Sequence, residues 1–343
     1  MLEKVDLKNF TVFRDLELEF SPGINIFIGK NSTGKTMLLK LLYSITRVLN
    51  ENDISKINKE ILSHNLTEKI NGVFQSGIGR LVTRGQGVRS SEQKFTFSKE
   101  KEKMILEISY STRHKKVEVS TEYAKFSLKK ALFIPAKEIL SMMSMGIIGL
   151  LEEYKFMDET YYDLAKALRF PIKSGRKNKE FNQILKHSGL SFIDSIVEEN
   201  EEYYIKIPQV GKLESKLLAE GYKKLGQLVL LLKNEQLTNN GYLFWDEPEA
   251  NINPYHIKSL VNLLIALTEI FDIQIFIATH NYFLIRYLDL LKEQKVNVKF
   301  FSLDINEQNE LRVSEANMLD DLEFNSIIEE FDKILEEDFK SFQ

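Results

Sequence analysis

The sequence predicts an α/β protein whose core is a mostly parallel β-sheet covered by helices on both faces. Three runs, INIFI at 24–28, YLFW at 242–245 and IQIFIAT at 273–279, are almost continuously apolar, which is typical of strands buried on both faces. Apolar residues at helical spacing follow the first run at 36–50 and separate the other two at 254–271. Strands that alternate with helices in this way form parallel sheets.

The N-terminal third also predicts antiparallel strands. Period-two alternation marks EKVDLKNF at 3–10 and FRDLELEF at 13–20, and the SPG turn that follows leads into the first buried run. Three later segments alternate in the same way and predict an antiparallel β-subdomain: KFTFSK at 94–99, MILEISYS at 104–111 and KVEVSTEY at 116–123.

The middle of the chain is predicted to be a helical insertion. FSLKKALFIPAKE at 126–138 indicates one more strand, and a helical pattern then runs to about residue 200, interrupted by the basic loop KSGRKNKE at 173–180. EEYYIKIP at 201–208 predicts a short strand, and the helical segment at 216–234 begins a second α/β unit. We therefore divide the chain into an N-terminal lobe with the β-subdomain (1–136), a helical insertion (137–211), a second α/β lobe (212–305) and an acidic helical tail (306–343).

The composition indicates a soluble protein of an ordinary kind. The 343 residues are 43% hydrophobic and 28% charged, and the absence of cysteine excludes disulfides, thiolate metal sites and a cysteine nucleophile. The N-terminal segment MLEKVDLKNF carries charges where a signal peptide needs an apolar stretch. The longest apolar runs, at 140–151 and 260–271, are about half of a membrane span. We therefore expect a cytoplasmic protein with no membrane partner.

The net charge of −4 is unevenly distributed. Residues 80–130 carry 13 Lys/Arg against 6 Glu and no Asp, whereas residues 318–343 carry nine acids against Lys333 and Lys340. The basic part, together with the 173–180 loop, either contacts the phosphates of DNA or faces solvent. The acidic end is predicted to form a helix that docks on its own lobe or on a partner, because these apolar residues have helical spacing: Phe324, Ile327, Ile328, Phe331 and Ile334.

A glycine-rich loop between the first buried strand and its helix predicts a phosphate-binding site. GKNSTGKT at 29–36 matches the pattern G-x-x-x-x-G-K-[ST], in which backbone N–H groups and the start of a helix face phosphate oxygens. Lys35 would reach the β- and γ-phosphates, and the Thr36 hydroxyl would bind Mg²⁺. The predicted nucleotide contacts are Gly29, Asn31, Ser32, Thr33, Gly34, Lys35 and Thr36.

Two further motifs complete a predicted ATP-hydrolysing site. The run YLFW ends in Asp246 and Glu247; the first carboxylate would hold Mg²⁺ through water and the second would activate the attacking water. His280 ends the next buried strand, and one strand–helix–strand step would place it beside Glu247, where it can hydrogen-bond a γ-phosphate. We predict ATP and Mg²⁺ as the ligands, with Lys35, Glu247 and His280 as the catalytic residues.

Three blocks of the chain resemble the ATP-binding-cassette-type (ABC-type) ATPases of the RecF, SMC and OLD kind, which are often called AAA-family ATPases. The blocks are DLKNFTVFRDLELEFSPGINIFIGKNSTGKT at 6–36, LFWDEPEANINP at 243–254 and IFIATHNYFLI at 275–285. The resemblance implies an ABC-type P-loop ATPase head with a mostly parallel core sheet, an antiparallel β-subdomain and an inserted helical lobe. It also implies that two heads form a homodimer or higher homo-oligomer by enclosing ATP between them.

The resemblance assigns several residues outside the phosphate loop. The signature motif that meets the ATP of the second head corresponds to Leu218–Gly221, with Glu220 and Gly221 as its contact residues; the usual serine is absent, and Lys223 or Lys224 would offset the charge of Glu220. Asn251 and Asn253 are expected at the dimer interface. Two assignments stay open: Phe13 approaches the adenine ring or belongs to the core, and Gln75 or Gln86 marks the glutamine loop.

Four functions are compatible with an ATPase head. The sequence disfavours a transporter subunit, because of the altered signature and the insertion, and a P-loop kinase or GTPase, because no N-K-x-D motif is present. An OLD-like nuclease needs a metal-dependent domain larger than residues 281–343, so we expect the effector to be a separate protein. The preferred hypothesis is a slow ATPase switch that controls a toxin or nuclease, as in bacterial anti-phage systems; the alternative is a RecF- or SMC-like ATPase in DNA repair or DNA-end processing.

Overall fold

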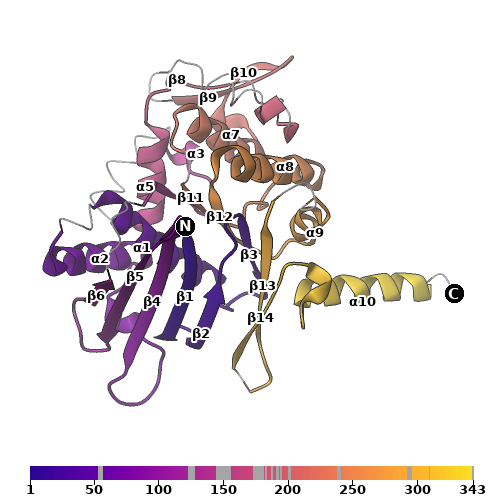
Figure 1. The fold of residues 1–343 in the computed structure, drawn as a ribbon. Coiled ribbons are helices and arrows are strands. Elements are labelled where there is room, and N and C mark those ends of the chain that lie inside the picture. Colours follow the sequence, from indigo (N-terminus) through magenta and orange to yellow (C-terminus); the bar gives the residue numbers. More distant parts are fainter. Residues whose placement is uncertain are drawn as a thin grey trace.

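A computed structural model of the chain shows an α/β fold with two large sheets and one small one (Figure 1). It describes residues 1–52, 57–122, 128–143, 156–172, 181, 184–186, 188–190, 193, 195–199, 202–237, 241–291, 296–308 and 310–341. The basic loop at 173–180 therefore lies outside the described residues.

The core sheet has six strands in the order β14-β13-β3-β12-β11-β7. All neighbouring strands pair in parallel except β13 and β14, which are antiparallel, as the almost continuously apolar runs predicted for the centre of the sheet. The strands are β3 (Ile24–Gly29), β7 (Ala131–Ile134), β11 (Tyr242–Asp246), β12 (Gln274–Thr279), β13 (Val298–Ile305) and β14 (Leu311–Ala316).

Helices and a second sheet cover the two faces of this core sheet. Alternate side chains of β3 divide between the faces: Ile24, Ile26 and Ile28 join one apolar cluster, and Phe27 joins the other. The first cluster includes residues of α5 (Glu159–Leu168), α7 (Glu220–Lys233), α8 (Pro254–Phe271) and α9 (Tyr282–Leu291). The second includes residues of α1 (Lys35–Glu51), α2 (Lys59–Phe74) and the antiparallel sheet.

The antiparallel sheet has the strand order β2-β1-β4-β5-β6 and packs beside α1 and α2 (Figure 1). Period-two burial along its strands agrees with the alternation in the sequence. A short 3₁₀ helix, η1 (Ile78–Leu81), connects α2 to the third of these strands in the chain. The strands are β1 (Leu2–Phe10), β2 (Phe13–Glu19), β4 (Ser90–Lys99), β5 (Glu102–Ser111) and β6 (Glu118–Glu122).

Two parts of the chain differ from the predicted helical segments. The predicted helical insertion contains α3 (Leu140–Met143) and α5, but its end forms a three-stranded antiparallel sheet and a 3₁₀ turn: β8 (Ser195–Glu199), β9 (Glu202–Ile207), β10 (Gly211–Glu214) and η2 (Ser215–Leu217). The predicted helical tail begins with β14 and η4 (Leu319–Asp321), because the edge of β13 offers backbone partners to residues 311–316. The boundaries of the four parts remain a prediction.

The acidic end becomes helical at α10 (Ser326–Ser341), which extends away from the rest of the molecule (Figure 1). Its first half docks on its own lobe, where Ile327 and Ile328 pack against the first apolar cluster and the Phe331 ring stacks on Tyr282 with centroids 3.9 Å apart. Its second half exposes Ile334, Leu335 and Phe339. Among the described residues, no helix is long and apolar enough to cross a membrane.

A buried charge cluster joins α1, α2 and α5. The Lys69 ammonium lies 2.9 Å from the Asp163 carboxylate, which also accepts a hydrogen bond of 2.6 Å from the Tyr43 hydroxyl. Lys69 also pairs with Glu159, and burial raises the pKa of that carboxyl. The charges of Lys69 and Asp163 are buried, so each depends on its partners for stabilisation.

We expect Asp163→Ala to lower the free energy of unfolding by ~3 kcal/mol, because it leaves a buried ammonium and a buried hydroxyl short of an acceptor. The matched control is Glu107→Ala, which breaks an exposed pair with Lys94 of 3.0 Å and should cost less than ~1 kcal/mol. Urea unfolding followed by circular dichroism measures both values. Equal losses would show that the buried cluster contributes no more than a surface pair.

Candidate functional site

The glycine-rich loop connects β3 to α1 at the carboxyl edge of the core sheet. Gly29 has a φ of 148° and Gly34 a φ of 93°, values that side chains disfavour. A Cβ on Gly29 would also lie 2.1 Å from the Leu303 carbonyl oxygen of β13, and one on Gly34 would lie 2.7 Å from the Phe13 ring. The two glycines therefore fit the loop tightly between the two large sheets.

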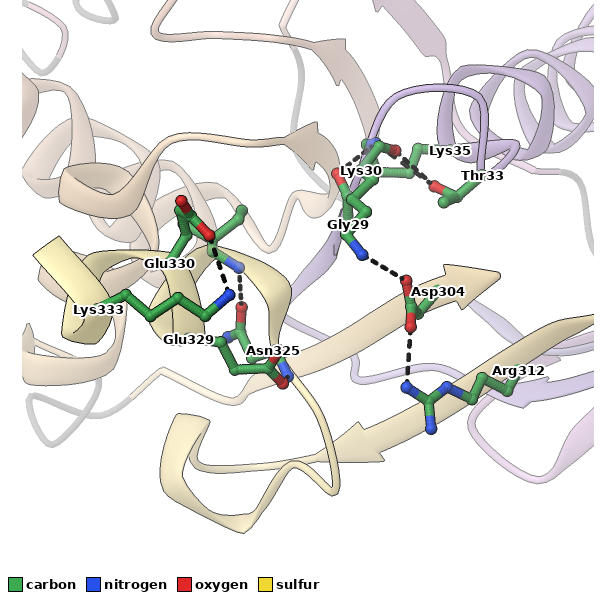
Figure 2. A network of polar contacts seen from close by, with 11 residues as sticks. Gly29, Lys30, Thr33, Lys35, Asp304, Arg312, Asn325, Glu329, Glu330 and Lys333 are labelled. Carbon is green, nitrogen blue, oxygen red and sulfur yellow. Dashed lines mark hydrogen bonds and ion pairs between the residues drawn. The ribbon is translucent and has the colours of Figure 1, made fainter. Parts of the chain in front are cut away.

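Lys35 lies inside the loop rather than in solvent. Its ammonium donates hydrogen bonds of 2.7 Å to the carbonyl oxygens of Gly29 and Lys30 (Figure 2). Burial lowers the pKa of Lys35, and the nearby carboxylates of Asp246, Glu247 and Glu249 oppose that shift. A buried ammonium with exchangeable carbonyl partners suits the binding of phosphate oxygens.

The two predicted magnesium ligands lie side by side. The Thr36 hydroxyl is 3.0 Å from both carboxylate oxygens of Asp246, across the gap between α1 and the end of β11. Burial raises the pKa of Asp246, and the Thr36 hydrogen bond counteracts it. The described residues contain no group of three or more His, Cys, Asp or Glu that could enclose a metal. One hydroxyl and one carboxylate fit Mg²⁺, which usually takes its other ligands from phosphates and water.

Glu247 and His280 face each other at the same sheet edge. Since β11 and β12 are parallel neighbours, both strands end here, and the His280 Nδ1 lies 3.1 Å from the Glu247 carboxylate. This is the adjacency that the spacing of the motifs predicted. The two side chains are 54% and 35% exposed, so both remain accessible from solvent. The arrangement can orient a water molecule and contact an anion beside it.

A second carboxylate behind this pair escaped the sequence analysis. Glu249 is buried and accepts a hydrogen bond from the Thr279 hydroxyl, while its other oxygen has no hydrogen-bond partner among the described residues. Burial raises the pKa of Glu249. The available signal was the second glutamate of the DEPE run at 246–249.

The signature segment and the loop after β11 contact each other within one chain. Gly221 lies in the first turn of α7, and a Cβ there would lie 2.5 Å from the Asn251 carbonyl oxygen. The Asn251 side chain donates a hydrogen bond to the Glu220 carboxylate. Asn253 caps α8 by accepting a 3.0 Å hydrogen bond from the Tyr255 N–H. The expected roles of these residues toward a second head remain predictions.

Two expectations concern side chains that are buried in the structure. Phe13 is fully buried, stacks parallel to Phe10 and lies against Gly34, so of the two roles left open for it, its position favours the core. The exposed apolar residue beside Gly34 is Val12. Lys223 and Lys224 are buried as well, and their ammonium groups donate hydrogen bonds to the Ser141 hydroxyl and to the Ala136 carbonyl oxygen, so neither forms an ion pair with Glu220 at the surface.

An ion-pair chain connects the phosphate loop to the edge of the core sheet. Lys30 lies 3.5 Å from Asp304 on β13, and Asp304 accepts a 2.8 Å hydrogen bond from Arg312 on β14 (Figure 2). The Arg312 guanidinium holds the pKa of the Asp304 carboxyl below its usual value. Arg312 also lies over the Phe324 ring, at 4.1 Å, just before α10. This chain of contacts connects the outer side of the loop to β13 and β14, although its Lys30 end is mostly exposed.

The two glutamine-loop candidates lie in different surroundings. Gln75 follows the last turn of α2 and lines a pocket of about 1040 Å³ beside α1, α2 and α5. Gln86 is exposed in the segment before β4. Neither assignment is tested by these positions.

Comparison with protein families identifies one match that spans most of the chain. Residues 24–286 match the family described as "AAA domain, putative AbiEii toxin, Type IV TA system". This range contains the phosphate loop, α7, the end of β11 and His280. The matched region therefore includes every residue of the site apart from those contributed by β1, β2, β13 and β14.

Curated relatives match a short part of the chain. The DNA replication and repair protein RecF of Listeria welshimeri is 36% identical over 92 residues, which cover 25% of this chain and 21% of that protein. RecF of Lactococcus lactis is 35% identical over 75 residues, covering 22% and 20%. The chain thus matches about a fifth of the length of these relatives.

Solved SMC heads share the fold over nearly the whole chain. An SMC head bound to the C-terminal winged-helix domain of ScpA superposes with a TM-score of 0.61 at 12% identity, covering 93% of this chain and 98% of that one. The SMC head of Thermotoga maritima gives a TM-score of 0.50 at 15% identity, covering 92% and 98%. The predicted ABC-type head architecture is confirmed by these likenesses.

We expect Lys35→Met to weaken ATP binding at least ~10-fold, because hydrogen bonds from a buried charge to phosphate are lost. The control is Lys30→Met in the same loop, whose ammonium is mostly exposed and whose loss should change the affinity less than ~3-fold. Titration calorimetry with ATP and Mg²⁺ measures both. Undiminished binding by Lys35→Met would exclude this loop as the phosphate site.

Proposed function

The chain belongs to the AAA-domain family that matches residues 24–286, and on this premise we propose that it binds and hydrolyses ATP as a nucleotide switch. The observation that supports this most directly is the meeting of three strand ends at one edge. Lys35 and Thr36 follow β3, Asp246 and Glu247 end β11, and His280 follows β12. The phosphate loop, the two proposed magnesium ligands and the Glu247–His280 pair can then all contact one nucleotide.

The proposed hydrolysis uses these side chains in separate roles. Lys35 and the loop N–H groups bind the phosphates, and Thr36 and Asp246 hold Mg²⁺, which neutralises charge on the phosphate oxygens. Glu247 accepts the proton of the attacking water as its oxygen bonds to the γ-phosphorus and the bond to the ADP oxygen breaks. His280 hydrogen-bonds the γ-phosphate and holds the Glu247 carboxylate in place.

Two heads closing over ATP would complete the site. Gly221 of one head would face the γ-phosphate bound by the other, with Asn251 and Asn253 at the contact. Leu217 and Tyr255, beside these positions in the chain, are 75% and 85% exposed. Large apolar side chains exposed next to a polar loop support an interaction surface here. Closure and reopening would then follow ATP binding and hydrolysis.

The proposed biological role is control of a separate effector, such as a toxin or nuclease in anti-phage defence. The family description names a putative AbiEii toxin of a type IV TA system, which supports a role for the present chain within a system of this kind. The second half of α10 adds an exposed apolar surface on which an effector could dock. Closure of the two heads on ATP would change the position of this part of α10 relative to a bound effector.

A second candidate function is binding of DNA. The segments around η1 and after β5 lie together, since a Cβ on Gly79 of η1 would lie 2.7 Å from the Thr112 carbonyl oxygen. Five exposed cations on these segments have no acidic partner among the described residues: Arg80, Arg84, Arg113, Lys115 and Lys116. The likeness to RecF, a DNA replication and repair protein, supports DNA as the ligand of this surface.

We expect Glu247→Gln to slow ATP hydrolysis ~100-fold or more, because the general base is lost while the phosphate grip remains. The ATP-bound pair of heads should then accumulate, seen as a dimer by size exclusion with light scattering in ATP and Mg²⁺. ADP serves as the control and should leave a smaller species. A Glu247→Gln protein that stays monomeric with ATP would contradict the proposed closure.

Neutralising Arg113, Lys115 and Lys116 to alanine should weaken DNA binding and flatten its salt dependence, because each phosphate contact contributes to that slope. The control replaces Lys99, Lys101 and Lys103, which lie at the opposite end of β5. Fluorescence anisotropy with a DNA duplex at several salt concentrations measures both. Absence of binding by the wild-type protein, or equal effects of the two triple variants, would exclude this surface as a DNA site.

A further inference from the structure

Lys224 occupies an unusual place beside the site. It lies on α7 with only 2% of its surface exposed, and its ammonium donates hydrogen bonds to two backbone carbonyl oxygens. One belongs to Ala136, 3.0 Å away and just after β7; the other belongs to Glu247. Lys224 therefore connects α7, the helix that begins in the signature segment (the signature helix), to Glu247, the residue that is proposed to activate water.

Burying the Lys224 ammonium is energetically unfavourable, because a charged group is removed from water. Burial lowers the pKa of Lys224 to about 8, even though Glu249, Glu247, Asp246 and Glu220 favour its charged form. The described residues include no carboxylate in ion-pair distance of its ammonium. A methionine or leucine would fill the same space without desolvating a charge. Lysine thus differs from methionine or leucine at this position in one favourable respect, its hydrogen bonds to the two carbonyl oxygens.

The carbonyl that Lys224 holds belongs to a strained residue. Glu247 has a φ of 46°, a left-handed conformation that is uncommon for residues other than glycine. Its N–H donates a 2.8 Å hydrogen bond to the Ala278 carbonyl oxygen on β12, and its own carbonyl accepts from the Ala250 N–H at 3.1 Å and from the Lys224 ammonium. These partners hold the turn that directs the carboxylate toward His280, and Lys224 is the one among them that comes from α7.

Helix α7 also contacts the far end of the loop that connects β11 to α8. Gly221 packs on the Asn251 backbone and Glu220 accepts a hydrogen bond from the Asn251 side chain, one turn before Lys224. Helix α7 thus contacts the loop at residues 247 and 251. A force on the N-terminus of α7 would reach Glu247 through a rigid helix and one hydrogen bond.

We propose that Lys224 is a positioning residue for ATP hydrolysis, which holds the Glu247 backbone in its strained turn and ties the carboxylate to the signature helix. The inference rests on the proposed ATPase function. Closure of a second head on Gly221 then acts on the helix that orients Glu247, so that hydrolysis depends on closure. Lys224 touches neither nucleotide nor water in this role.

The test compares Lys224→Met with Lys223→Met. Lys223 is the neighbouring buried lysine of α7, but its ammonium donates to the Ser141 hydroxyl at 2.8 Å and lies 3.7 Å from Glu138, away from the Glu247 loop. We expect Lys224→Met to lower kcat ~100-fold, the loss typical of a displaced catalytic group. Its KM and its calorimetric affinity for ATP should stay within ~3-fold of wild type, because the phosphate loop and Lys35 are unchanged. Lys223→Met should keep kcat within ~3-fold.

Further variants separate positioning from a general loss of structure. Lys224→Arg keeps a buried cationic donor and should lose only ~10-fold in kcat. If Lys224→Met fails to fold by circular dichroism, Lys224→Gln replaces it, with the same expected loss. The proposal is overturned if the Lys224 and Lys223 variants lose kcat equally, if Lys224→Met keeps the wild-type kcat, or if the loss appears in ATP affinity instead. Wild-type turnover no faster than that of Glu247→Gln would instead refute the ATPase function itself.

Discussion

Parallel pairing of β3, β12 and β11 is the constraint on which the rest of the molecule depends. In parallel strands the carboxyl ends lie at one edge, and three ends therefore bring together Gly29, Asp246 and Thr279 from distant parts of the chain. The same pairing requires both faces of the sheet to be covered. Helices and the antiparallel sheet supply that cover and, in doing so, bring α1 and α7 to the site.

Close packing beneath the phosphate loop gives the site its rigidity. The loop is held from one side by the Phe13 ring under Gly34 and from the other by the Leu303 carbonyl beside Gly29. A side chain at either glycine would collide with these neighbours, so only glycine lets the loop backbone approach them this closely. The antiparallel sheet thus serves the site through packing, with the buried Phe13 ring lying against the loop.

Polar groups that are buried near the site connect its parts. Lys35 holds the loop carbonyls, the Thr36 hydroxyl meets Asp246, and Lys224 reaches the Glu247 carbonyl from α7. Lys35 and Lys224 are buried and Thr36 and Asp246 are half-buried, so these groups depend on their partners and the arrangement resists independent movement of one element. The proposed nucleotide switch would need such coupling, because binding at one loop has to alter the position of another.

The sequence by itself determined the features that depend on local chemistry. The phosphate loop, the acids that end β11, His280 and the apolar strands are encoded in short runs, and the order of strands and helices placed His280 beside Glu247. Only the tertiary structure decided which way a side chain faces when several partners compete for it. Phe13 joined the core, Lys224 turned inward and residues 311–316 paired with β13, because burial and backbone hydrogen bonds are set by neighbours far away in the chain.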